Sequence, residues 1–213
     1  MRPITRSAAV VMSAFTILAM TALPAAAKTD KQVAKAASIT AKDVGRGWTA
    51  KKQAADKPSG ISECSVKEAA DKRALKYKFE SPDFQQGDAR VSNSVYVFPK
   101  VKDAQAYLAA FQDPSTIDCL QLGLEAALAD SAGASVTVEN LDVTGGPVDD
   151  GVGFRATITI PDGAIDATLI FEAVAFRVGR GVTGLTTNNA NEALPITPDL
   201  ATASIKRLKR GLR

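Results

Sequence analysis

Alternating apolar and polar residues between positions 152 and 187 predict antiparallel β-strands joined by tight turns. The segment 161–163, Pro-Asp-Gly, is a strong turn signal. If Ile160 faces Ile165 across this turn, every pair on one face of the hairpin is apolar. A shift by one residue would expose the whole apolar set, so the pattern determines which residues share a face.

A second hairpin is predicted around a turn at Gly179-Arg180. This turn aligns three pairs: Arg177 with Val182, Ala175 with Gly184, and Ala173 with Thr186. On the strand shared by the two hairpins, three large apolar residues lie on the face opposite to the first apolar set: Val174, Phe176 and Val178. Either a bulge turns the strand over or both faces of the sheet are covered.

Apolar residues at offsets of three and four predict three helices. The first follows Val101, with Ala104, Leu108 and Phe111 on one face, and the second follows Pro114 and contains Cys119. The third begins at 197–199, Thr-Pro-Asp, with proline at its first helical position and Gly211 as a candidate C-cap.

The remaining segments predict further elements. Strands are expected at 75–80, 91–98 and 135–143, a turn-rich connection at 81–88, and a short helix with Cys64 at 62–72. Residues 28–39 are interpreted as a flexible leader or short helix, and Thr40 with Asp43 resembles a capping box. Together these elements predict an α+β fold in which an antiparallel β-sheet is flanked by helices, with a single domain over residues 40–213.

Residues 1–27 have the pattern of a secretory signal peptide. Arg2 and Arg6 precede an uncharged stretch over residues 8–23, and a run of three alanines ends at Ala27. This stretch is shorter than the roughly 20 residues that cross a bilayer as a helix. We expect cleavage after Ala27, a secreted protein and no transmembrane anchor in the mature chain. An uncleaved anchor is the alternative.

Composition excludes several kinds of chemistry. The 213 residues include no histidine, which rules out Ser-His triads, Cys-His dyads and His-ligated zinc. Without residues 1–27 the basic and acidic side chains nearly balance, so nucleic-acid binding is not expected. In an exported chain, Cys64 and Cys119 predict a structural disulfide, with two reactive thiols as the alternative.

Acidic residues near the first hairpin raise the possibility of carboxylate catalysis or calcium binding. They are Asp149, Asp150, Asp162 and Asp166. Their spacing matches no calcium loop, and aspartate is common in turns because its side chain bonds to the local backbone. We interpret them as turn residues and expect no metal, no cofactor and no catalytic residues.

The candidate ligand-binding residues lie on the polar face of the first hairpin. They are Arg155 and Glu172, with Ile170 and Val174 nearby. A polar pair beside apolar surface suits a ligand cleft. The alternative is an ordinary cross-strand ion pair.

The C-terminal helix ends in basic residues, namely Lys206, Arg207, Lys209, Arg210 and Arg213. Positive charge is favourable at a helix C-terminus, and the long side-chain stems can cover apolar surface. The alternative is peripheral contact with an anionic surface of the cell envelope.

A set of ordered features resembles a known family. Gly47-Trp48 is followed by Cys64, the stretch SNSVYVFPKVKDAQAYLAAF, Cys119, GVGFRATITI, ATLIFEAVAFRVGRGVTGL and a closing helix. This resembles the actinobacterial exported sensor-domain family, which is similar to the extracellular domain of the kinase PknH and to LpqN-type envelope lipoproteins. The resemblance implies a PsbP-like fold and a cleft for an envelope ligand. It departs from the PknH domain in having cysteines for one disulfide instead of two.

Three functions follow as hypotheses. The first is a secreted, non-catalytic binding or sensor-type domain of the cell envelope for a lipid-like or other envelope molecule. The second is a carboxylate-dependent hydrolase of envelope substrates. The third is a protein-interaction module that uses the basic C-terminal helix.

Overall fold

The structure is a computed structural model that describes residues 28–52, 77–143, 148–161, 166–194 and 197–213. The predicted signal peptide and the predicted helix at 62–72 lie outside the described residues, as does Cys64. Because of this, the pairing of Cys64 with Cys119 stays a prediction.

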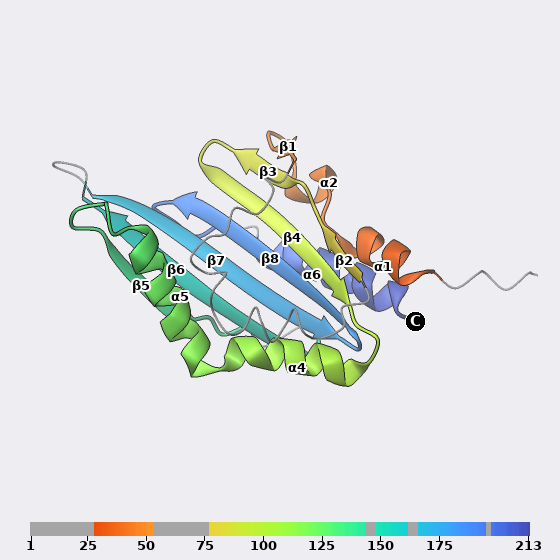
Figure 1. The fold of residues 1–213 in the computed structure, drawn as a ribbon. Coiled ribbons are helices and arrows are strands. Elements are labelled where there is room, and N and C mark those ends of the chain that lie inside the picture. Colours follow the sequence, from red (N-terminus) through yellow and green to blue (C-terminus); the bar gives the residue numbers. More distant parts are fainter. Residues whose placement is uncertain (1–27, 53–76, 144–147, 162–165, 195–196) are drawn as a thin grey trace, which may run out of the picture.

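The described residues form one antiparallel sheet of eight strands (Figure 1). The strands are β1 (Thr49–Lys51), β2 (Tyr77–Glu80), β3 (Asp83–Gln86), β4 (Ala89–Val97), β5 (Ser135–Asn140), β6 (Asp150–Ile160), β7 (Ala167–Val178) and β8 (Gly181–Ala190). Their order across the sheet is β1-β3-β4-β8-β7-β6-β5, and β2 also pairs with β4.

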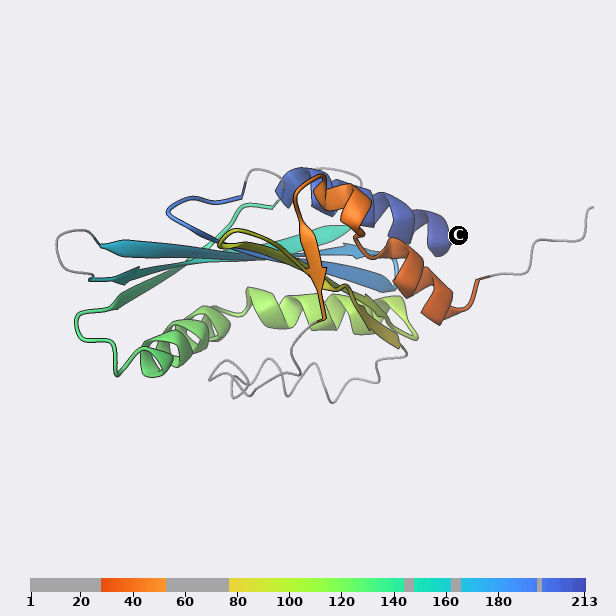
Figure 2. The same cartoon turned by 90° about the horizontal axis from the view of Figure 1, so that it is seen from above.

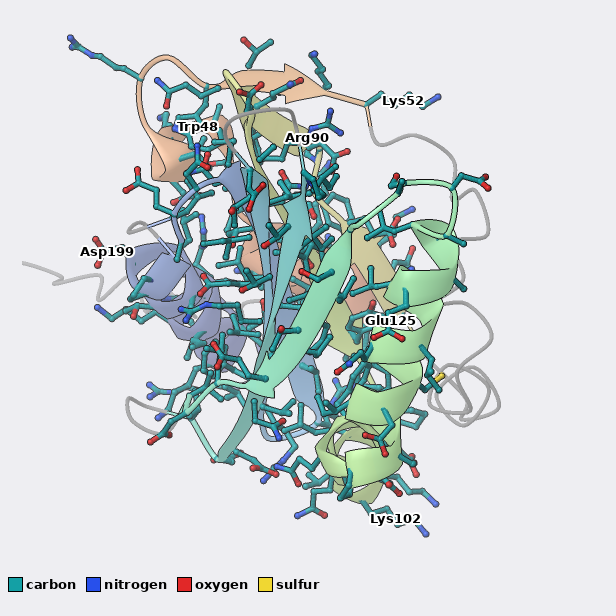
Figure 3. The ribbon with its side chains drawn as sticks, turned by 90° about the vertical axis from the view of Figure 1, so that its left-hand side faces the viewer. Trp48, Lys52, Arg90, Lys102, Glu125 and Asp199 are labelled. Carbon is teal, nitrogen blue, oxygen red and sulfur yellow. The ribbon has the colours of Figure 1, made fainter. Side chains whose placement is uncertain are left out.

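Helices cover both faces of the sheet (Figure 2). The helices α1 (Asp30–Ala37), α2 (Ala41–Val44) and α6 (Thr197–Gly211) lie on one face, and α4 (Val101–Gln112) and α5 (Pro114–Ala127) lie on the other. Glu125 of α5 and Asp199 of α6 mark these two sides in Figure 3. The predicted α+β architecture, an antiparallel sheet flanked by helices in a single domain, is confirmed.

Each face of the sheet has its own apolar core. Val174, Phe176 and Val178 of β7 are buried in the core beneath α1 and α6. Phe98, Tyr107, Leu108 and Val182 form a smaller core beneath α4. No bulge interrupts the pairing of β6 with β7 from Asp150–Arg177 to Ile160–Ala167, so of the two sequence interpretations the covering of both faces is correct.

The predicted register of the first hairpin is wrong by two residues. Ile160 faces Ala167 rather than Ile165, and Arg155 faces Glu172. A shift of two leaves every side chain on its predicted face, because side chains alternate with a period of two. The register of the second hairpin is confirmed, with Arg177 opposite Val182 across the Gly179-Arg180 turn.

Of the two interpretations of residues 28–39, the structure has the short helix, α1, and this helix is part of the core instead of a flexible leader. Thr29 and Gln32 cap the N-terminus of α1 reciprocally, and Val33 and Ala34 are 2% and 0% exposed. α1 packs against α6, β2 and β4. The sequence suggested a leader because the segment is rich in lysine and alanine, and its apolar face is only a few residues long.

Two further expectations need correction. The segment 81–88 holds the strand β3, whose single large apolar residue, Phe84, is buried against the core. Gly211 is the last residue of α6 and has no left-handed φ, so it is not a C-cap. A Cβ built on Gly211 would lie 2.9 Å from Cγ1 of Val33, so this glycine permits α6 to approach α1.

Buried polar side chains attach α1 and α6 to the sheet. Asn93 of β4 is 1% exposed, and its amide donates to Thr183 Oγ1 at 2.9 Å and accepts from the Ile39 amide at 3.1 Å. The hydroxyl of Ser204 in α6 lies 2.6 Å from that of Thr183 and donates to the Ala37 carbonyl at 2.8 Å. Buried polar groups persist when they are bonded in this way.

The capping box at Thr40 is confirmed. The carboxylate of Asp43 accepts from the backbone amide of Thr40 at 2.6 Å and from its hydroxyl at 2.8 Å. The same oxygen accepts from Arg207 of α6 at 2.9 Å. Burial opposes ionisation of Asp43, but the hydrogen bonds from Arg207 and Thr40 outweigh it and lower its pKa.

Candidate functional site

A hollow of about 160 Å³ is lined by residues of α4 and of the sheet. Helix α4 lies on the face of the sheet opposite to α6 (Figure 2). Residues of β4, β6, β7, β8 and α4 line it: Ser94, Tyr96, Tyr107, Phe111, Val152, Gly153, Phe154, Ala173, Val174, Ala175, Val182, Gly184, Leu185 and Thr186. We call this hollow the α4 groove.

The floor of the α4 groove is a row of small residues. Ser94 of β4 faces Gly184 of β8, and Gly184 faces Ala175 of β7, so three neighbouring strands place short side chains side by side. Val152 of β6 continues the row, facing Ala175.

Larger side chains stand on both sides of the row, in the direction of the strands. On β4, Tyr96 lies two residues from Ser94, and on β6, Phe154 lies two residues from Val152, on the same face of the sheet in each case. Phe154 also contacts Phe171 of β7, with ring centroids 6.0 Å apart. The hollow is therefore bounded along the strands by aromatic rings.

Helix α4 contributes two aromatic residues one turn apart, Tyr107 and Phe111, whose ring centroids are 5.2 Å apart. Tyr107 also lies 5.2 Å from the rings of Tyr96 and of Phe98. Aromatic contacts of this kind hold the rings in defined orientations. The wall of the α4 groove is thus built from side chains that support one another.

The α4 groove offers few polar partners. Its lining contains no charged side chain, and its side-chain polar atoms are the hydroxyl groups of Ser94, Thr186, Tyr96 and Tyr107. Ala173, Ala175 and Gly184 on the floor are only partly buried, so solvent reaches them. Among the described residues, no group of three His, Cys, Asp or Glu could hold a metal ion. The arrangement suits the apolar end of a ligand.

The structure brings Arg155 and Glu172 into direct contact. Arg155 donates from Nε at 3.0 Å and from Nη2 at 2.7 Å to Oε1 of Glu172, and from Nη1 at 3.2 Å to Glu139 of β5. Glu172 is 7% exposed. Its hydrogen bond raises the pKa of Arg155 above the ordinary value. This is the geometry of a cross-strand ion pair, completed by a carboxylate that the sequence interpretation did not include.

The four predicted ligand-binding residues share the face of the sheet that α6 covers. Ile170 and Val174 lie two residues on either side of Glu172, and the Val174 side chain packs into the core beneath α6. Of these four, only Val174 also lines the α4 groove. The role of the four in ligand binding stays a prediction, and the apolar hollow is on the other face.

Sequence reasoning did not identify the α4 groove, although it placed Gly184 opposite Ala175. The usable signal was a glycine facing an alanine at the centre of a sheet, where packed strands normally carry larger residues. Phe111 was assigned to a helix face, but nothing in that periodicity indicated that it leans over a gap.

The comparisons with known proteins support the fold alone. No protein-family model matches the sequence, and no curated protein matches it. The chain is similar in structure to the extracellular domain of PknH from Mycobacterium tuberculosis, with a TM-score of 0.53 and 10% sequence identity. That likeness covers 85% of this chain and 97% of the PknH domain.

The distant resemblance expected from the sequence is therefore present at the level of the fold. No described helix has the length and apolar character needed to cross a membrane.

Proposed function

We propose that this chain is an exported, non-catalytic binding domain and that the α4 groove holds the apolar end of a lipid-like envelope molecule. The observation that carries the proposal is the row formed by Ser94, Gly184 and Ala175, which leaves a gap between the sheet and α4. The pattern of residues 1–27 and the fold shared with an extracellular domain support export.

The size of the α4 groove limits its occupant. A cavity of about 150 Å³ lined by apolar residues holds one benzene ring, and the α4 groove is about 160 Å³. It would therefore take one ring or the end of an acyl chain, while the rest of the ligand stays outside. Burying about six carbons contributes roughly 5 kcal/mol, which corresponds to a dissociation constant on the order of a few hundred micromolar.

Chemical-shift titration tests the proposal. The protein is labelled with ¹³C at its alanine methyl groups and titrated with decanoate, an acyl chain that can place its end in the hollow. We expect saturable shifts at Ala173 and Ala175, which line the α4 groove, and unchanged shifts at Ala34 and Ala37 of α1, on the opposite face of the sheet.

A filling variant and a matched control make the test specific. A Cβ on Gly184 would meet no atom closer than 3.8 Å, so a side chain can start there without a clash, and Gly184→Val is designed to fill the hollow. We expect this variant to lose the decanoate shifts. Thr157→Val places the same side chain on the opposite face of the sheet and should keep them. Equal binding by the wild type and Gly184→Val would contradict the proposal.

A further inference from the structure

Charge is strongly segregated along this nearly neutral chain. Residues 28–52 and 197–213 hold 12 lysines and arginines against three acidic residues, a formal charge of +9. The described residues between 77 and 194 hold seven basic and 15 acidic residues, a formal charge of −8. The first group includes α1, α2 and α6, which lie on one face of the sheet, and the second includes α4 and α5 on the other (Figure 2).

On α6 the exposed cations form a single stripe. Lys209 and Arg210 lie three and four residues after Lys206 in α6, all three are exposed, and the exposed Arg213 follows two residues beyond the end of the helix. The opposite side of α6, with Ala201, Ser204, Ile205 and Leu208, is buried on the sheet. The cations therefore point away from the body of the protein.

Helix α1 extends this stripe. Lys31 and Lys35 are exposed and one turn apart, while Val33, Ala34 and Ala37 are buried. The close approach of Gly211 to Val33 places the C-terminal end of α6 beside α1. The two helices together present Lys31, Lys35, Lys206, Lys209 and Arg210, a set we call the basic helix layer.

Two of the three acidic side chains in residues 28–52 and 197–213 form ion pairs with arginines outside the basic helix layer. Asp30 of α1 accepts from Arg180 of the β7–β8 turn at 2.5 Å, and Asp43 accepts from Arg207 at 2.9 Å. The third acid, Asp199, is exposed at the N-terminal end of α6, away from the stripe.

Helix electrostatics alone does not account for the basic helix layer. Like charges four residues apart destabilise a helix, and the pair 31–35 in α1 and the pair 206–210 in α6 have this spacing. Lys31 also lies in the first turn of α1, where positive charge opposes the helix dipole. An external anionic partner would offset these repulsions.

We propose that the basic helix layer binds the surface of an anionic lipid bilayer. Neither α1 nor α6 contains an aromatic residue, which disfavours stacking on nucleic-acid bases. Neither helix has an exposed large apolar residue that could insert into lipid. Contact is therefore by charge alone, through flexible lysine stems against headgroup phosphates. The α4 groove would then face away from the lipid surface.

Vesicle sedimentation tests this surface. The protein should pellet with vesicles of equal parts phosphatidylglycerol and phosphatidylcholine at low salt, and stay in the supernatant with phosphatidylcholine alone or at high salt. The variant Lys206→Gln/Lys209→Gln/Arg210→Gln should bind at least tenfold more weakly. The variant Arg90→Gln/Lys100→Gln/Lys102→Gln removes the same charge from exposed residues outside the basic helix layer and should bind like the wild type.

Two further measurements distinguish the outcomes. Lys31→Gln/Lys35→Gln removes charge from α1 alone and should also weaken vesicle binding, which separates the effect from any damage to α6. A lipid carrying gadolinium should broaden the amide signals of α1 and α6 but not those of α4 and α5. Equal loss in the two triple variants would overturn the proposal, as would tighter binding to duplex DNA than to the anionic vesicles at the same salt.

Discussion

The side-chain amide oxygen of Asn93, in the middle of β4, accepts a hydrogen bond from the backbone amide of Ile39 at 3.1 Å, 54 positions earlier in the chain. This bond joins the segment that follows α1 to the centre of the sheet. Since Asn93 also bonds to Thr183, which contacts Ser204 of α6, one buried side chain links the sheet to two helices of the layer above it.

Removal of the Asn93 side chain should be costly. Asn93→Ala leaves the Ile39 amide and one side of the Thr183 hydroxyl without partners, and each buried unsatisfied group costs about 1–3 kcal/mol. We expect a loss of at least ~3 kcal/mol in the free energy of unfolding, measured by urea denaturation. Ser92→Ala, on the same strand but only partly buried, is the control and should change stability little. Equal effects of the two changes would contradict the role of this network.

The contact of α1 with α6 predicts a coupled pair of mutations. Ala is favoured over Gly in helices by about 1 kcal/mol, yet a Cβ on Gly211 would lie 2.9 Å from Cγ1 of Val33. Gly211→Ala should therefore lower the unfolding free energy in the wild type and raise it in the Val33→Ala background. A double-mutant cycle by thermal unfolding measures this change of sign, and additive effects would show that the two helices do not meet there.

Two glycines in the strands should respond oppositely to alanine. At Gly184 the added Cβ lies 3.8 Å from its nearest neighbour, so Gly184→Ala should raise stability by roughly 0.5 kcal/mol through the unfolded chain. At Gly153 it would lie 2.8 Å from Val143 Cγ1 and 3.0 Å from Val174 Cγ1, so Gly153→Ala should lose about 1–3 kcal/mol. Calorimetric melting of both variants checks the ranking.

The ionised carboxylate of Asp43 should stabilise the fold in a pH-dependent manner. Its folded pKa is lowered, so its contribution is complete above the unfolded pKa of about 3.9 and is lost as pH falls through the lower folded pKa. Asp43→Asn should therefore have a lower unfolding free energy than the wild type at neutral pH. This difference between the two proteins should disappear at acid pH. Urea denaturation across this range is the measurement, and a gap independent of pH would exclude an ionic role.

The predicted disulfide can be tested on the exported protein. If Cys64 and Cys119 are bonded, the intact mass should be unchanged by a thiol-alkylating reagent until a reductant is added. The chain-entropy model assigns such a bond ~4 kcal/mol, so the variant with both cysteines replaced by serine should unfold at lower denaturant. Alkylation of the native protein without reductant would refute the bond.

The pattern of side chains predicted the faces of the strands better than their pairing. In the second hairpin the turn at Gly179-Arg180 contains two residues, and Gly179 adopts φ 55°, so the turn itself sets the register. In the first hairpin, apolar alternation is satisfied equally by any even shift, so Ile160 could be assigned to Ile165 when its partner is Ala167.

The candidate site was harder to predict because it depends on three strands at once. Arg155 and Glu172 could be chosen from the sequence because they are charged residues on one face of the first hairpin. In the structure they form an ion pair on the α6 face. The α4 groove arises where Ser94, Gly184 and Ala175 coincide, and the pairing of β4 with β8 is not encoded by any local turn. Only the assembled sheet shows that these short side chains are neighbours.

The α4 groove exists because three positions carry small side chains, so few substitutions are needed to fill it. Bulkier residues at Ser94, Gly184 and Ala175 would close it while the backbone stayed the same. Domains that share this architecture at 10% identity can therefore differ in whether they have a groove that could bind a ligand. Before a ligand known for one such domain is assigned to another, the quantity to compare is the side-chain volume at these three positions, more than the similarity of the backbones.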